Sequence, residues 1–170
     1  MSDLILAAET QFRFNSQMLS IGLSDLTDED AGWRLKGGDG SSISYIVGHI
    51  SSSRYGLMKL LGTVEENPYA ELYGSGVGSK DASAYPPIAE LRAGWDAGAE
   101  KLHAALDSLS DEDALAADDG GFPTPDQTLR GRLSFIAWHE SYHIGQIGVL
   151  RTERGYPSMR KMLYAAKEAG

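Results

Sequence analysis

Apolar residues recur at helical spacing in four long segments of the chain, and no segment shows the strict apolar-polar alternation of a half-buried strand. In the first segment, one side of a helix would carry Leu4, Ile5, Ala8, Phe12 and Leu19. The pattern predicts an all-α fold. Its four long helices are expected over residues 4–23, 43–61, 86–109 and 124–154.

Capping residues and a glycine mark the ends of the second predicted helix. Ser41 and Ser42 precede its first apolar residue, and a serine hydroxyl can accept a hydrogen bond from a backbone N–H of the first turn. Gly62 follows Leu61, and glycine often ends a helix because it adopts the left-handed backbone conformation without strain. Both ends of this helix are therefore predicted from local sequence.

The fourth predicted helix has two possible starts. The segment "TPDQ" (residues 124–127) supplies a capping threonine, a proline suited to the first helical position and a glutamine that can complete a capping box. A start near Thr128 is the alternative. We expect the helix to end near Arg154, because Gly155 and Pro157 follow as stop signals.

A long connection rich in Gly, Ser and Pro separates the second and third helices: "GTVEENPYAELYGSGVGSKDASAYPP", residues 62–87. A short link would force antiparallel neighbours, whereas this one can carry the chain back along a whole helix. Helices two and three could therefore point the same way. Residues 63–85 could also form a lid, and composition does not separate a lid from a crossover.

Short helices are expected after the first, third and fourth long ones. "LSDLTDEDA" (23–31) and "LDSLSDEDA" (106–114) each place a capping Thr or Ser before three acids, which suits the positive end of a helix dipole. Their similarity is either chance or a sign that the chain is two related helical hairpins. The final stretch, "YPSMRKMLYAAKEAG" (156–170), predicts one short basic amphipathic helix.

Composition narrows the class of protein. A chain of 170 residues is most simply a single domain, and the absence of cysteine excludes disulfides, thiolate metal ligands and a cysteine nucleophile. The formal charge of -9 argues against nucleic acid or an anionic membrane as a partner. The short apolar run at the N-terminus follows Asp3 and does not resemble a signal peptide. We expect a soluble cytoplasmic protein.

Two histidines on the fourth helix are candidate metal ligands. His139 and His143 lie four residues apart, about 40° from each other on one helical face, and share that face with Ile136 and Ile147. Both imidazoles should therefore point inward, where unpaired ring nitrogens are costly. They could share one metal ion, since this spacing suits a common ligand sphere. The alternative is a pair of core histidines bonded to backbone and neighbouring side chains.

His49 is the third candidate ligand. It lies at the edge of the second helix's apolar stripe, and the following "SSS" leaves room beside its ring. Three histidines with open coordination positions are typical of a reactive metal site rather than a closed structural one. The fourth histidine, His103, lies on the flank of the third helix near Lys101 and Asp107, and is expected to be solvated.

The segment "HESYH" (139–143) matches H-E-x-x-H, the motif of zinc proteases. The longer metzincin motif needs a glycine and a third histidine where this chain has Gln146 and Val149. A later glutamate ligand is also missing, since only Glu153 and Glu168 follow. We therefore reject a zincin protease and interpret the match of Glu140 as incidental.

Three segments together resemble the DinB/YfiT-like superfamily of small bacterial helical proteins. "HESYHIGQIGVLR" resembles the H-x-x-x-H-x-G-Q segment of its last helix, "SISYIVGHISSSRYG" resembles its second helix, and "LTDEDAGWRL" resembles the link between its first two helices. The resemblance implies an up-down-down-up four-helix bundle with a long connection between helices 2 and 3. It also implies a homodimer and a divalent metal, nickel or zinc, bound by His49, His139 and His143.

Three classes of function remain open. The leading one is a metal-dependent transferase or hydrolase acting on a small-molecule substrate, and the resemblance adds a low-molecular-weight thiol such as bacillithiol or mycothiol as a cofactor. Gln146 could orient a ligand and Arg132 could pair with an anionic substrate, although both could be ordinary boundary residues. No catalytic residue is assigned. The other classes are a non-catalytic metal-dependent stress or binding module and a metal-free dimerising bundle.

Overall fold

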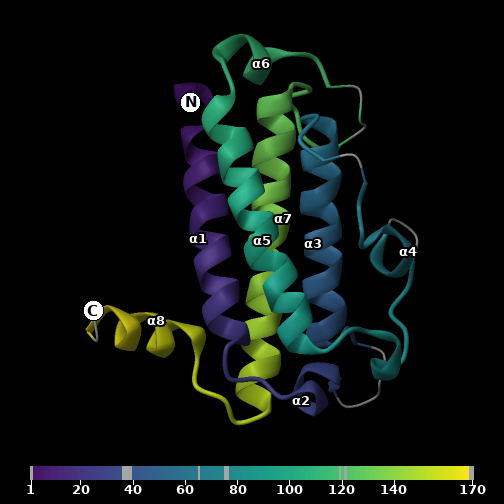
Figure 1. The fold of residues 1–170 in the computed structure, drawn as a ribbon. Coiled ribbons are helices and arrows are strands. Elements are labelled where there is room, and N and C mark those ends of the chain that lie inside the picture. The colour runs from purple at the N-terminus through teal and green to yellow at the C-terminus, as the bar shows by residue number, and fades with distance from the viewer. Residues whose placement is uncertain are drawn as a thin grey trace.

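The chain folds into helices, as its apolar pattern predicts (Figure 1). Among the residues described, no strand occurs, and the single β-bridge joins Ala117 to Thr128. Four helices are long: α1 (Leu6–Leu23), α3 (Ile43–Leu60), α5 (Ile88–Ser108) and α7 (Leu129–Glu153). The computed structural model describes residues 2–35, 40–64, 66–74, 77–118, 120 and 122–168.

The four long helices lie side by side. Helix α1 packs against α5 and α7, and α3 packs against the same two helices. In Figure 1 the turn that carries α2 (Asp28–Gly32) joins α1 to α3 at the lower end, and α6 (Asp111–Leu115) lies at the upper end between α5 and α7. Each long helix therefore buries one stripe against two neighbours, which agrees with its single apolar face.

The starts of α1 and α7 differ from the predicted ones. A 3₁₀ turn at Asp3–Ile5 precedes α1, which begins at Leu6. Helix α7 begins at Leu129, so the start at Thr124 is wrong and the alternative near Thr128 is confirmed. Thr124 instead closes a turn, its Oγ1 donating to the Asp126 carbonyl at 2.6 Å. The bridge from Thr128 to Ala117 keeps the backbone extended until the helix begins.

The other predicted ends agree with the structure. Ser42 caps α3 by accepting a hydrogen bond from the Tyr45 N–H, and Gly62 follows the helix with φ of 69°. Gly155 ends α7 in the same left-handed conformation, with φ of 83°. The short helices α2 and α6 are also present, each capped by the expected Thr or Ser side chain. Local capping chemistry thus predicts most boundaries.

The long connection packs on the outside of α3. It contains α4 (Ala70–Tyr73) and a 3₁₀ turn at Ala82–Ala84. The buried ring of Tyr73 lies against Gly48 of α3 so closely that a side chain at that glycine would overlap it. Glycine therefore provides the space that lets this segment dock beside His49.

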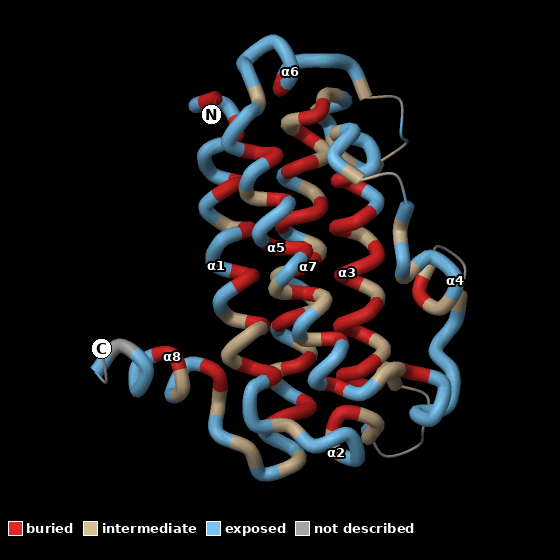
Figure 2. Tube along the Cα trace, in the orientation of Figure 1, coloured by how far each residue is buried: buried red, intermediate tan, exposed pale blue. Residues whose placement is uncertain are grey.

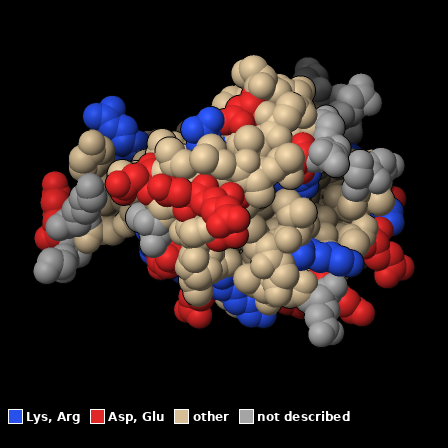
Figure 3. All heavy atoms as spheres, turned by 90° about the horizontal axis from the view of Figure 1, so that it is seen from above, with Lys and Arg blue, Asp and Glu red and all other residues tan. Residues whose placement is uncertain are grey.

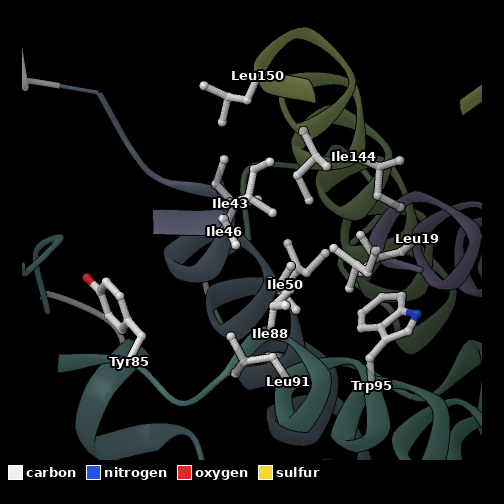
Figure 4. Packing of buried hydrophobic residues seen from close by; sticks show 14 of the residues in the cluster. Leu19, Ile43, Ile46, Ile50, Tyr85, Ile88, Leu91, Trp95, Ile144 and Leu150 are labelled. Carbon is white, nitrogen blue, oxygen red and sulfur yellow. The ribbon is translucent and has the colours of Figure 1, made fainter. Parts of the chain in front are cut away.

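Buried residues form two hydrophobic clusters along the inward faces of the long helices (Figure 2). Figure 4 shows one of them, where side chains from α1, α3, α5 and α7 meet around Trp95 and Ile50. Helix α8 (Met159–Glu168) extends away from the lower end of the long helices beside α1 and buries Met159 and Leu163. It is the short amphipathic helix expected at the end of the chain.

The surface is rich in charge. Seen from above, acidic side chains form a continuous group on the upper end of the molecule, with basic side chains scattered around it (Figure 3). Within the described ranges, no helix combines the length and apolarity that crossing a membrane requires.

Candidate metal centre

Three histidine rings converge between α3 and α7. His139 Nε2 lies 3.2 Å from His49 Nε2 and 3.1 Å from His143 Nε2, and one nitrogen of each ring lies within 4.8 Å of the others. Zinc–nitrogen distances of about 2.0–2.1 Å place neighbouring ligand nitrogens about 3.0–3.4 Å apart. His139 Nε2 thus lies at the spacing of ligands around a shared ion from both other Nε2 atoms, and the convergence expected from the sequence is present.

Aromatic neighbours hold the rings in this arrangement. Tyr45, one turn before His49 on α3, stacks on its ring with centroids 5.8 Å apart. Phe135, one turn before His139 on α7, stacks on that ring at 6.2 Å, and Tyr142 meets His143 edge-on at 5.1 Å. Because these contacts come from residues four positions away or adjacent on the same helix, each helix orients its own histidines.

Gln146 sets the protonation of His143. Its Oε1 lies 2.7 Å from His143 Nδ1, so that Nδ1–H donates to the amide oxygen and Nε2 keeps its lone pair for the cluster. The Gln146 amide nitrogen donates in turn to the Tyr142 hydroxyl at 3.2 Å. Gln146 therefore touches a histidine of the cluster.

The remaining ring nitrogens favour a bound cation. His49 Nδ1 and His139 Nδ1 are buried, and neither has a hydrogen-bond partner of good geometry in the described part of the chain. If each Nδ1 carried the proton, the lone pair of His139 Nε2 would face those of His49 and His143 at hydrogen-bond distance with no donor between them. A divalent ion would satisfy all three, so the donor set fits a metal of the kind that accepts imidazole.

Burial keeps the three histidines neutral. It lowers the pKa of His139 to about 4, with His143 and His49 adding to the effect because two neighbouring imidazoles resist a second charge. Burial also lowers the pKa of His49, which the Tyr73 backbone partly opposes, and that of His143, which Gln146 partly opposes. At neutral pH all three rings are therefore in the form that binds metal.

A cavity of about 580 Å³ opens beside the cluster, here called the histidine cavity. His49 and His139 form part of its wall. The remaining wall comes from α3, from the connection that contains α4, from α7, and from Phe122, which precedes α7. This volume is within the usual range for sites that bind small molecules. Gln146 lines a separate, smaller pocket of about 230 Å³.

Arg132 lines the histidine cavity two turns of α7 before His139. Its Nε and Nη2 bond both carboxylate oxygens of Asp118, and its guanidinium lies over the Phe122 ring, 4.3 Å from the centroid. The sequence left open whether Arg132 pairs with an anionic substrate. In the structure, its partner is the carboxylate of Asp118.

Glu140 has a structural partner that the sequence interpretation missed. Its side chain is 0% exposed and forms a bidentate ion pair with Arg54 of α3, at 2.8 and 2.7 Å. The match to H-E-x-x-H is therefore incidental to metal chemistry, but the residue itself is part of the core. The sequence contained a signal for a buried arginine that needs a partner, because Arg54 lies four residues after Ile50 and three before Leu57, inside an apolar stripe.

His103 takes no part in the cluster. It is half-buried rather than solvated, which corrects the expectation, and its Nε2 lies 3.2 Å from the Ser16 hydroxyl. Burial lowers its pKa, and the nearby positive charges of Arg54 and Arg13 lower it further.

Comparison with known proteins identifies the family. The sequence profile of the DinB superfamily matches residues 11–147, which include all three histidines, and the chain belongs to that superfamily. A DinB-like protein from Bacillus cereus ATCC 10987, solved by crystallography, is similar with a TM-score of 0.66 and 18% identity. The match covers 88% of this chain and 91% of that one, and at this identity it supports the fold alone. No curated protein matches the sequence.

Proposed function

We propose that this protein is a metal-dependent enzyme acting on a small molecule, with a divalent ion bound by His49, His139 and His143. The observation that carries the proposal is the convergence of three neutral imidazoles, two of which, His49 and His139, line a cavity large enough for a substrate. A closed structural zinc site would be expected to have a fourth protein ligand, whereas this donor set leaves coordination positions open.

Such an ion would supply Lewis-acid activation of a water or thiol, because three neutral ligands leave its positive charge uncompensated. The protein's own residues prepare the site for this. Gln146 holds the His143 tautomer that presents Nε2. We propose thiol transfer or hydrolysis as the reaction class, with nickel or zinc as the metal and a low-molecular-weight thiol as a co-substrate.

We also infer that α1, α3, α5 and α7 form an up-down-down-up four-helix bundle. The neighbour pattern of these helices supports it, as does the long connection that returns outside α3 before α5 begins. In that topology α3 and α7 are adjacent, which is the arrangement that the three-histidine site needs.

Metal analysis of protein purified without a histidine tag tests the proposal. We expect close to one nickel or zinc ion per chain, and a higher melting temperature when either metal is added to metal-free protein. Absence of bound metal together with no thermal stabilisation by nickel, zinc or manganese would contradict it.

Catalysis needs a separate test. The metal-loaded protein should convert an electrophile in the presence of a small thiol, or hydrolyse it without one. Metal binding without any product, over a broad set of thiols and electrophiles, would favour the non-catalytic binding module instead.

A further inference from the structure

The histidine cavity has the shape of a channel along two helices. Arg132 lies seven residues before His139 on α7, a distance of about 10 Å along the axis. On α3, Ser53 and Gly56 follow His49 by four and seven residues and so lie on the same face of that helix. The cavity therefore runs about two helical turns, with the histidines at one end and Arg132 at the other.

Small residues on one wall create this space. Ser52, Ser53 and Gly56 of α3 line the cavity together with Phe135 and Phe122. A side chain built on Gly56 would meet no atom within 4 Å, so that part of the channel is open. An aromatic ring of a ligand could lie there against the two phenylalanines, where offset or edge-to-face contacts are favourable.

The polar groups of the wall are mostly used within the protein. The Ser53 hydroxyl donates to the His49 carbonyl at 3.2 Å, and the Asn67 amide donates to the carbonyl and hydroxyl oxygens of Ser52 at 3.0 Å. One exception is Tyr73, which is 1% exposed and whose hydroxyl has no partner among the described residues. The channel thus offers a ligand mainly apolar contacts.

Charge at the Arg132 end of the channel is neutralised. Among its described lining residues, Arg132 alone carries a formal charge at neutral pH, and both oxygens of Asp118 are bonded to it. Asp118 does not line the cavity, but an anion placed at this end would be close to the Asp118 carboxylate paired with the guanidinium. Removing an anion from water without a net attractive charge is costly, so this end of the channel disfavours carboxylates and sulfonates.

From these contacts we propose that the histidine cavity binds an uncharged, elongated molecule with an aromatic body, and that Asp118 determines this specificity by neutralising Arg132. The aromatic part lies between Gly56 and the phenylalanines. The claim that such a molecule is the substrate rests on the proposed metal function. The claim that the cavity prefers this class of ligand does not depend on the metal.

Two fluorescent probes with one ring system test the ligand class. N-phenyl-1-naphthylamine is uncharged, and 1-anilinonaphthalene-8-sulfonate adds a sulfonate to the same frame. Titrations are made in 1 M salt, where the screening length falls to about 3 Å and the net charge of the protein matters little. We expect the uncharged probe to bind at least about tenfold more tightly, because the sulfonate must lose its hydration.

Matched variants locate the binding. Gly56→Phe should weaken the uncharged probe at least about tenfold by filling the channel. Gly145→Phe is the control, since Gly145 is an exposed helical glycine on α7 that does not line the cavity and also has open space beyond it. Asp118→Asn should leave Arg132 unpaired and shift the preference toward the sulfonate. Equal or tighter sulfonate binding by the unmodified protein, or no effect of Gly56→Phe, would overturn the proposal.

The same titrations are repeated with a chelator and with added zinc. A protein that binds no metal but keeps the preference for the uncharged probe supports the ligand class and contradicts the metal function. A protein that binds metal but shows no preference contradicts the ligand class and leaves the metal function standing. The two proposals can therefore fail separately.

Discussion

The guanidinium of Arg54 on α3 and the carboxylate of Glu140 on α7 form a bidentate ion pair inside the core. Arg54 also lies over the Trp95 ring, 3.6 Å from its centroid, and Asn15 donates to Glu140 at 3.3 Å. The pair joins the two helices that carry the histidines, five residues after His49 and one after His139. It thus links α3 to α7 close to the three histidines.

Removing either partner of this pair should destabilise the protein. Arg54→Ala or Glu140→Ala leaves an uncompensated buried charge, which typically costs about 3–5 kcal/mol. Urea unfolding measures the loss. Asp96→Ala is the control, because its pair with Arg92 is largely exposed, at 3.8 Å, and such pairs contribute about 0–1 kcal/mol.

The double variant Arg54→Met/Glu140→Leu separates loss of the pair from loss of packing. Apolar replacements of similar size remove both charges, so this variant should be more stable than either alanine variant. If the free energy of unfolding of each alanine variant is within about 1 kcal/mol of that of the unmodified protein, the pair does not stabilise the core as predicted.

The three histidines should contribute alike to metal affinity. His49→Ala and His139→Ala should each weaken binding by more than the roughly 10–100-fold typical of changes outside the ligand sphere. His103→Ala is the control, since His103 contacts Ser16 and not the cluster. Isothermal titration with zinc or nickel gives the affinities. Full metal occupancy in the His49 variant would disprove the three-ligand site.

Gln146 should affect metal binding without affecting folding. Gln146→Leu removes the acceptor for His143 Nδ1 and should lower metal affinity about 10–100-fold. Gln146→Glu keeps an acceptor oxygen and should restore most of the affinity. Gln17→Leu on the exposed side of α1 controls for adding an apolar side chain. An unchanged affinity in Gln146→Leu would mean that the His143 tautomer needs no such support.

Acid should destabilise the metal-free protein in a window set by its histidines. The pKa values of His49, His103, His139 and His143 all lie below the ordinary 6.5, so the unfolded chain takes up protons first as the pH falls. The free energy of unfolding should therefore decrease from pH 6.5 toward the pKa of His139 at about 4. Urea unfolding at a series of pH values measures this.

A matched variant assigns the effect to histidine. His139→Asn removes one of the titrating groups and should flatten the dependence between pH 6.5 and 4. Carboxylates affect stability at lower pH. Hydrogen bonds from Tyr156 and Thr27 hold the pKa of Asp30 at about 2, so its contribution to stability is lost only below the ordinary pKa of 3.8. A free energy of unfolding that does not change between pH 6.5 and 4 would contradict the prediction.

Much of the candidate site could be predicted because its chemistry is local. The spacing of His139 and His143 on one helix puts both rings on one face whatever surrounds it. Boundaries at Ser42 and Gly155 likewise depend on a few adjacent residues. The start of α7 could not be chosen, since the bridge that keeps Thr128 extended comes from Ala117, in a different part of the chain.

The sequence by itself determined the helices, most of their ends and the three histidines that could serve as ligands, because hydrophobic period, capping and helical spacing are short-range properties. Only the tertiary structure decided that Glu140 pairs with Arg54, that Asp118 neutralises Arg132 and that a cavity opens beside His49. Each of these depends on distances between side chains far apart in sequence, which the packing of helices sets and no local pattern contains.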